Sequence, residues 1–226
     1  MSDRLRIVAR LASPLAGEAP ELDALLEWAM SAHHKKDEPG YKVDRKFAAP
    51  ELAALPIPIL RRTIGGWPVG CCSSPIVAAE AETVEHFGKR LSVENARLLD
   101  PDNRRVVATT NSWTKSYRLP LRIRAVDRIV WFAIGERRSV QHTLKQVRAL
   151  GQKVSDGYGR VASWEVESGA PDVCWFADGP HGRVLMRSLP AGDELPKNLV
   201  GYRTDFGPVC PPYWHHERYC ERVVPC

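Results

Sequence analysis

The sequence has no long hydrophobic run. None of its apolar stretches reaches the roughly 20 residues that a membrane-spanning helix needs. The first residues place Asp3, Arg4, Arg6 and Arg10 close together and lack the apolar core of a signal peptide. We therefore expect a cytoplasmic protein that does not associate with membranes.

Motifs of common hydrolases and metalloenzymes are also missing. The chain contains no GxxxxGK[ST] loop for nucleotide hydrolysis, no HExxH, no GxSxG, and no carboxylate array suited to two-metal phosphodiester chemistry. The sequence therefore gives no motif for an enzyme of these classes, and we expect no cofactor and no metal.

Cysteines are few, and their spacing specifies neither a disulfide framework nor a common zinc site. The six are Cys71, Cys72, Cys174, Cys210, Cys220 and Cys226, with no CxxC pair among them. The last three lie near His215 and His216, so a metal site at this end is one interpretation. Free thiols in a reducing cytoplasm are the other, and we favour it.

Positive charge is present, and it is concentrated in one part of the chain. The 226 residues are 44% hydrophobic and 26% charged, as in an ordinary globular protein that can bury a core. Residues 104–160 carry 13 Lys and Arg against three acids, although the whole chain has a net charge of only +5. With Trp113, Tyr117 and Tyr158 interspersed, this stretch predicts a nucleic-acid surface. The alternative is a solvated face with no ligand.

Within the basic stretch, the spacing predicts a helix from about Ser139 to Gly151. Its apolar positions recur at helical intervals and are Val140, Leu144, Val147 and Leu150. Ser139 can cap the start of the helix, and Gly151 can end it.

A glycine-rich turn follows the predicted helix and precedes a predicted strand over 161–166. Gly157, Gly159 and Ala162 fit the letters of a dinucleotide fingerprint, but that fingerprint needs a strand before the glycines and a helix after them. Here the order is reversed. The glycines either let a phosphate chain approach between Lys153 and Arg160 or form a tight turn with positive φ.

The order of elements predicts an α+β fold. Residues 128–135 form a mostly apolar strand, so the segment reads strand, helix, glycine turn, strand, which is half of a ferredoxin-like βαββαβ unit. The chain also begins with an alternating strand, 5–11, and an amphipathic helix, 22–30. We expect Trp28 and Met30 of this helix to lie in the core.

Several shorter elements are predicted between and after these. Two short strands flank Gly65 and Gly66 as a hairpin. Residues 106–110, 184–190 and 219–225 have strand character. In the strand 119–126, Arg122 and Arg124 share one face, where they can either grip successive phosphates or form cross-strand ion pairs.

Three stretches resemble a known family: DRIVWFAIG with RRSVQHTLKQVRALGQKVSDGYGRVASWEV, the opening LRIVARLASPLAGEAPELDALLEWAM, and the closing PPYWHHERYCERVVP. They are similar to the RAMP superfamily of CRISPR-associated proteins, and most of all to the Cas-five-like subunit of type IV effector complexes. The likeness fades between about Lys35 and Ser112.

This resemblance implies a fold, a domain organisation and a function. The chain would be a single RAMP domain over 1–226 with a ferredoxin-like, RRM-like fold. Residues 36–112 would form a thumb-like insertion, and 168–226 a closing segment rich in strands and turns. It would be a noncatalytic RNA-binding subunit that caps the 5′ handle of the crRNA in a type IV CRISPR surveillance complex. It would contact the backbone subunit, the large subunit and target DNA near the flanking motif.

The predicted RNA-binding residues combine the charge pattern with this resemblance. They are Lys115, Arg122, Arg124, Arg137, Arg138, Lys153, Gly157, Tyr158, Gly159 and Arg160.

Two other functions stay open. Some Cas-five-like relatives mature the guide as metal-independent endoribonucleases, and His33, His34 and His142 are the candidate acids and bases here. His33 and His34 also fit the cationic end of a helix, where they offset its dipole. A purely structural subunit, whose basic face contacts only protein acids, is the other possibility.

Overall fold

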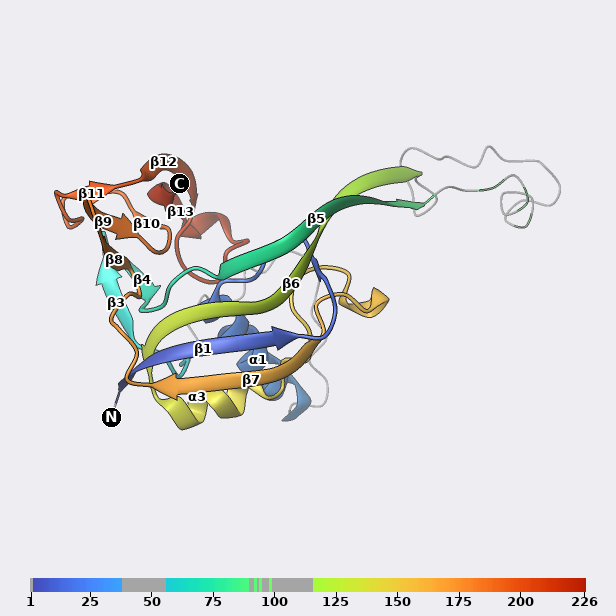
Figure 1. Cartoon of the computed structure of the whole chain (residues 1–226), viewed down its shortest axis with the longest axis horizontal. Coiled ribbons are helices and arrows are strands. Elements are labelled where there is room, and N and C mark those ends of the chain that lie inside the picture. Colours follow the sequence, from blue (N-terminus) through green and yellow to red (C-terminus); the bar gives the residue numbers. More distant parts are fainter. Residues whose placement is uncertain (1, 38–55, 90–91, 93, 95–97, 99–115) are drawn as a thin grey trace.

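The protein has an α+β fold dominated by antiparallel strands (Figure 1). The computed structural model describes residues 2–37, 56–89, 92, 94, 98 and 116–226. The elements of the first part are β1 (Asp3–Leu11), β2 (Leu15–Ala16), α1 (Leu22–Asp37), β3 (Arg61–Ile64), β4 (Trp67–Gly70), β5 (Ile76–Lys89), β6 (Tyr117–Gly135), α3 (Arg137–Leu144), η1 (Val154–Asp156) and β7 (Val161–Ser168). The closing part contains β8 (Phe176–Gly179), β9 (Gly182–Leu185), β10 (Leu189–Pro190), β11 (Leu199–Val200), β12 (Tyr202–Pro208), η2 (His216–Arg218) and β13 (Tyr219–Pro225).

The main sheet contains β5, β6, β1 and β7 in this order, and the short β2 also pairs with β6, at Ile123 and Arg124. Every neighbouring pair is antiparallel. Ile7 of β1 lies opposite Trp131 of β6 on one side and Val166 of β7 on the other. Alternate residues of these strands point to the same face, which packs with α1 and α3 into one core. The buried core residues are Leu5, Ile7, Ala9, Leu15, Leu22, Leu25, Leu26, Ala29, Ile59, Cys72, Val126, Ile129, Trp131, Ala133, Val140, Leu144, Val147, Leu150 and Val166.

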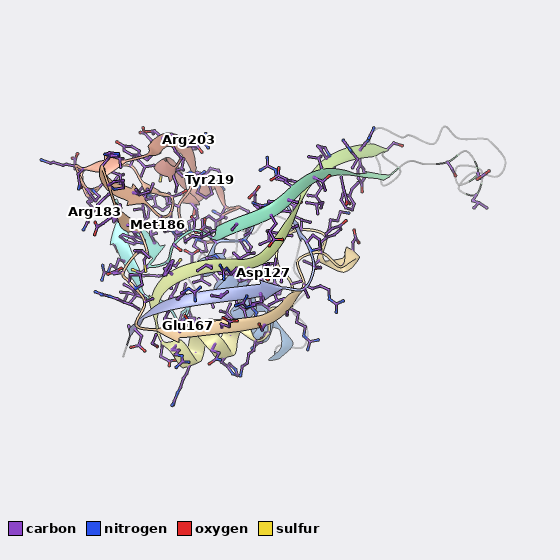
Figure 2. All side chains as sticks on the ribbon, in the orientation of Figure 1. Asp127, Glu167, Arg183, Met186, Arg203 and Tyr219 are labelled. Atoms are coloured by element: carbon purple, nitrogen blue, oxygen red, sulfur yellow. The ribbon has the colours of Figure 1, made fainter. Side chains whose placement is uncertain are left out.

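The opposite face of β1 carries arginines that pair with acids. Arg6 Nη1 lies 3.0 Å from an oxygen of Glu167, and Arg10 Nε lies 2.8 Å from an oxygen of Glu165. Arg10 also reaches Asp127 at 3.3 Å, and Figure 2 labels Asp127 and Glu167. These pairs largely offset the positive charge of Arg6 and Arg10.

β6 joins two predicted strands into one of 19 residues. Its second half pairs with β1 in the sheet, while its first half pairs with β5 as a two-stranded ribbon that leaves the body of the molecule (Figure 1). The bulges near Ala79 mark the region where the ribbon begins.

A buried polar cluster joins the closing part of the chain to α1. Arg187, between β9 and β10, donates from Nη2 to Asp23 of α1 at 3.0 Å and to the Tyr213 hydroxyl at 2.6 Å. Its Nη1 donates to the carbonyl of Gly70 at 2.9 Å and to Cys72 Sγ at 2.9 Å. Asp23 is 0% exposed and Arg187 is 1% exposed. The cluster fixes four segments that lie far apart in the sequence.

Most sequence-predicted elements are confirmed. The first strand is β1, the first helix is α1, the hairpin at Gly65 and Gly66 is β3–β4, and the last strand is β13. The predicted strand 184–190 is wrong in its middle, because β9 ends at Leu185 and β10 begins at Leu189. Arg187 lies between the two strands and is drawn into the buried cluster.

The predicted helix over 139–151 is too long. Glu136, not Ser139, caps α3, because its carboxylate accepts hydrogen bonds from the backbone N–H groups of Arg138 and Ser139. α3 ends at Leu144, and Leu150 N–H then donates to Gly159 O at 2.9 Å. Pairing with the glycine turn therefore competes with helix in this segment.

The prediction that Trp28 lies in the core is wrong. Its side chain is 59% exposed, while Met30 is partly buried. At about 100° per residue, Trp28 is roughly a third of a turn from the middle of the stripe formed by Leu22, Leu26 and Ala29. An aromatic residue beside a helical stripe is easily counted as part of it.

Two predictions concern segments that the structure describes only in part. The predicted strand 106–110 lies outside the described residues. Within the predicted insertion 36–112, β5 belongs to the main sheet, and the division into domain and insertion stays a prediction. No helix in the described part of the chain is long and apolar enough to cross a membrane.

Candidate nucleic-acid interface

The glycine turn between α3 and β7 depends on positive φ angles. Gly157 has φ +96° and Gly159 has φ +62°. A Cβ on Gly159 would overlap the carbonyl oxygen of Leu150, whereas a Cβ on Gly157 would meet nothing within 4 Å. Gly159 is thus required for close packing, and Gly157 is a place where a ligand can approach the backbone.

The turn is fixed to the segment between β1 and β2. Gly159 N–H donates to Pro14 O at 2.8 Å, Ser13 Oγ donates to Gly157 O at 2.8 Å, and Arg160 N–H donates to Ser13 Oγ at 2.9 Å. These contacts form between residues about 145 positions apart in the sequence. The backbone of the turn is therefore preorganised by tertiary contacts.

Tyr158 and Lys153 attach the turn to β5. The Tyr158 hydroxyl donates to Glu85 at 2.8 Å, and this hydrogen bond raises the pKa of Tyr158. The Tyr158 ring meets the edge of Phe87 at 6.1 Å between centroids, and Lys153 Nζ lies 4.8 Å from the centre of Phe87. Lys153 also lies 3.7 Å from Asp156. Both predicted RNA-binding side chains are engaged within the protein.

Arg122 and Arg124 form ion pairs, as the alternative interpretation of their strand predicts. Arg122 Nε lies 3.2 Å from Glu82, and Arg124 Nη2 lies 3.0 Å from Glu18 and donates to Gly17 O at 2.7 Å. Their positive charge is therefore partly neutralised within the protein.

The ribbon also separates these arginines from the glycine turn. In the register of β5 and β6, Arg122 and Arg124 lie opposite Val84 and Glu82. Glu85 and Phe87, which contact the turn, have the other parity along β5 and so face the other side of the ribbon. The two groups of predicted residues do not form one surface.

Arg137 and Arg138 lie at the far end of the main sheet. Arg137 Nε donates to Val166 O at 2.9 Å, opposite Ile7 of β1, while the glycine turn lies at the C-terminal end of β1. Along β7, Val166 is six residues from Arg160, which is about 20 Å at about 3.3 Å per residue. Lys115 and the side chains of His33 and His34 lie outside the described part of the structure.

Two exposed cations in the segment that pairs with Arg160 were missed by the sequence prediction. Lys145 and Arg148 lie in the turn after α3. In this turn Arg148 O accepts a hydrogen bond from Val161 N–H at 2.9 Å, and Ala149 forms an isolated antiparallel β-bridge with Arg160. Lys145, Arg148 and Arg160 are exposed, and none has an ion-pair partner among the described residues. We call these three residues the turn cations. Recognising them requires knowing that the helix ends at Leu144.

The cysteines and histidines of the closing segment show no metal site. Among the described residues, no group of three or more His, Cys, Asp or Glu side chains is placed to hold a metal ion. His215 is 4% exposed, and its Nδ1 accepts from Glu217 N–H at 3.3 Å. All six cysteines are free, and burial raises the pKa of Cys174 to about 12, so that thiol stays protonated.

A cavity lies between α1 and α3. It has a volume of about 620 Å³ and is lined by Met30, residues 56–58, Arg138, Ser139, His142 and Thr143. His142 lines this cavity and is exposed. A single histidine at this position does not by itself make a catalytic pair.

Comparison with known proteins identifies the family. No match is found among curated proteins. Residues 76–225, about two thirds of the chain, match the family described as CRISPR type IV associated protein Csf3. The matched region contains β5, β6, α3, the glycine turn and the closing strands. The chain therefore belongs to the family of the CRISPR type IV associated protein Csf3.

Proposed function

We propose that this chain is a noncatalytic RNA-binding subunit of a type IV CRISPR surveillance complex, in which it caps the 5′ handle of the crRNA. Membership in a type IV CRISPR family supports a place in a complex with other Cas subunits. The arrangement of the glycine turn supports RNA as the ligand.

The sheet order supports a ferredoxin-like RAMP fold. Numbered by their place in a βαββαβ unit, β1, β5, β6 and β7 are strands one to four, and the order in the sheet is four, one, three, two. α1 follows the first strand and α3 follows the third, as this unit requires. The closing strands and the β3–β4 hairpin are then additions to the unit.

The single observation that carries the RNA proposal is the open space beside Gly157 in a turn whose flanking segments carry the exposed turn cations. A rigid turn with space at a glycine lets a sugar–phosphate chain approach closely. Lys145, Arg148 and Arg160 supply exposed charge that is free to contact phosphates. The hydrogen bond from the Tyr158 hydroxyl to Glu85 then positions the turn against the ribbon, and neither side chain contacts the RNA.

The same proposal extends to the partners. Contacts with the backbone subunit, the large subunit and target DNA near the flanking motif follow from the position of a handle-capping subunit at one end of the guide. They require surfaces other than the glycine turn, which the handle would occupy.

The test uses the purified protein with labelled repeat RNA in EDTA, at low and high salt. We expect a salt-sensitive gel shift and intact RNA. Replacing Arg148 and Arg160 by Ala should weaken the shift strongly, whereas the matched change of Arg6 and Arg10, which are paired with acids, should weaken it little.

Two results would contradict the proposal. A discrete cut in EDTA that is lost in His142→Ala would favour the metal-independent endoribonuclease. Equal binding by the Arg148/Arg160 and Arg6/Arg10 variants would move the RNA site away from the turn cations.

A further inference from the structure

The outer edge of β12 is the feature that the RNA site does not use. β12 is the last strand of the sheet β10–β13–β12, so one side of it has no neighbouring strand in the described part of the chain. Residues 202–206 are all exposed. Figure 1 shows β12 at the top of the closing region, near the C-terminus.

Two hydrogen bonds at the ends of β12 fix which of its backbone groups face outward. Cys226 N–H donates to Gly201 O, and Val209 N–H donates to Arg218 O. In the register of β12 and β13, the hydrogen-bonded positions therefore alternate through Arg203, Asp205 and Gly207. The N–H and C=O groups of Tyr202, Thr204 and Phe206 point away from β13.

The outward groups of β12 are mostly unoccupied within the described residues. Phe206 N–H is bound by the side chain of Asp205 at 2.8 Å, but Thr204 has no hydrogen-bond partner on this side among the residues that the structure describes. Arg222 Nη1 donates to the outward carbonyl of Pro208 at 2.8 Å, as Arg137 donates to Val166 O at the edge of β7. Among the described residues, the outward groups left for a partner are therefore those of Tyr202 and Thr204 and the carbonyl of Phe206.

Exposed aromatic side chains lie on the same strand. Phe206 is 69% exposed and Tyr202 is 44% exposed, and both point to one face of β12 because they are four residues apart. Phe206 also packs on Tyr219 of β13, with ring centroids 6.2 Å apart. On the same face, Val223 lies opposite Thr204 and is buried in a second hydrophobic cluster with Ile64, Val69, Leu185 and Leu189.

The charge of this region favours a protein partner over nucleic acid. Residues 168–226 contain six Lys and Arg against seven acids, in contrast to the basic stretch 104–160. Figure 2 labels Arg203 and Tyr219 in this part of the molecule. Arg203 is exposed with no ion-pair partner among the described residues, so it can receive an acidic side chain.

We propose that the edge of β12 binds an extended segment of another protein subunit of the complex, which adds a strand to the sheet. The segment has apolar residues at alternate positions that cover Tyr202 and Phe206, and an acidic residue that meets Arg203 on the other face. The proposal rests on the proposed function only in that it assumes a multisubunit assembly.

The central test removes one outward N–H group. Thr204→Pro deletes that donor while leaving the β12–β13 ladder intact, since proline is tolerated in edge strands where its nitrogen faces solvent. Thr204→Ala is the matched control that keeps the donor. The probes are the purified backbone and large subunits of the same CRISPR system. We expect the Pro variant to bind one of them about tenfold more weakly, with the Ala variant unchanged.

A cross-linking experiment identifies the occupant. A photoreactive phenylalanine analogue at position 206 in the assembled complex should react with an extended segment of that subunit. Reaction with RNA, reaction only with a second copy of this chain, or equal subunit binding by the Pro and Ala variants would overturn the proposal.

The two proposals can fail separately. Both Thr204 variants are expected to shift repeat RNA like the unmodified protein. Loss of subunit binding without any RNA shift by the unmodified protein would contradict the handle-capping function and leave the edge proposal standing.

Discussion

The arginines of this protein fall into two contrasting environments. Arg187 is 1% exposed and makes hydrogen bonds to Asp23, Tyr213, Gly70 and Cys72. Burial lowers its pKa, but the charge of Asp23 outweighs this, and the pKa of Arg187 stays well above its usual value. Arg148 and Arg160 are exposed and have no ion-pair partner among the described residues.

This difference in burial distinguishes an arginine that stabilises the fold from arginines that we propose to bind RNA. A buried guanidinium is tolerated only when its hydrogen bonds and its charge are satisfied, so Arg187 is committed to the fold. An exposed cation keeps its hydration and its freedom to exchange water for phosphate. Under the proposed function, substitution should therefore affect stability at the buried arginine and RNA affinity at the exposed ones.

The largest expected effect is on Arg187. Arg187→Met removes the positive charge and leaves Asp23 buried without its counter-ion, which should cost about 3–5 kcal/mol of unfolding free energy. Denaturant unfolding measures this. Arg183→Met is the control, since Arg183 is exposed and 3.7 Å from Asp178, and it should change stability by less than about 1 kcal/mol. Equal losses of unfolding free energy in the two variants would contradict the expected difference between the buried and the exposed arginine.

The two glycines of the turn should differ in the same way. Gly159→Ala combines a positive φ with an overlap on the Leu150 carbonyl, and we expect a loss of about 3 kcal/mol. Gly157→Ala adds a Cβ in open space, so only the φ strain of about 1 kcal/mol applies. Thermal or urea unfolding of both variants checks this. A larger loss for Gly157→Ala would show that the turn packs differently.

The salt dependence of RNA binding tests whether the exposed arginines contact phosphates. Each phosphate contact removed should reduce the slope of log K against log salt by about 0.7 for single-stranded RNA. We expect this for Arg148→Ala and for Arg160→Ala separately, measured by filter binding over a salt series. Arg122→Ala, whose guanidinium is 3.2 Å from Glu82, should reduce the slope less. A slope unchanged by all three would contradict a role in phosphate binding.

The smallest effect concerns Glu21, beside the buried cluster. Burial raises the pKa of Glu21, and its Oε2 has no hydrogen-bond partner among the described residues. The folded state therefore binds a proton more tightly than the unfolded state does. Stability should fall as the pH rises from the usual glutamate value through the raised pKa.

Glu21→Gln tests this by removing the titrating group. The variant should lose that part of the pH dependence. The urea midpoint of the variant minus that of the unmodified protein should therefore increase as the pH rises from the usual glutamate value towards neutrality. Glu80→Gln, on an exposed position of β5, should run parallel to the unmodified protein. A constant difference between the Glu21→Gln variant and the unmodified protein across this range would refute the assignment.

Much of the fold was predictable because its signals are local. The alternation in β1, the stripe of Leu22, Leu26 and Ala29 in α1, and the glycine pair of the β3–β4 hairpin each lie within a few residues. The family resemblance was confirmed by the match over 76–225. These features depend on periodicity and on short motifs, which survive without knowledge of the three-dimensional structure.

The site was harder to predict because pairing is a tertiary property. The sequence prediction placed Arg122 in the site, but the register of β5 and β6 makes Glu82 its diagonal neighbour, and the two side chains form an ion pair. It missed Arg148, since the end of α3 at Leu144 is decided by hydrogen bonds to the glycine turn. The sequence prediction also assigned Arg137 and Arg160 to one site, but the length of β7 keeps these two residues apart.

The sequence by itself determined an α+β chain, a concentrated positive charge, a glycine turn and a likeness to type IV CRISPR proteins. Only the tertiary structure decided which cations are free, which glycine is open, and which sheet edge is uncovered. The physical reason is that propensity and periodicity act between near neighbours, whereas charge neutralisation, steric overlap and edge pairing depend on residues brought together from distant positions.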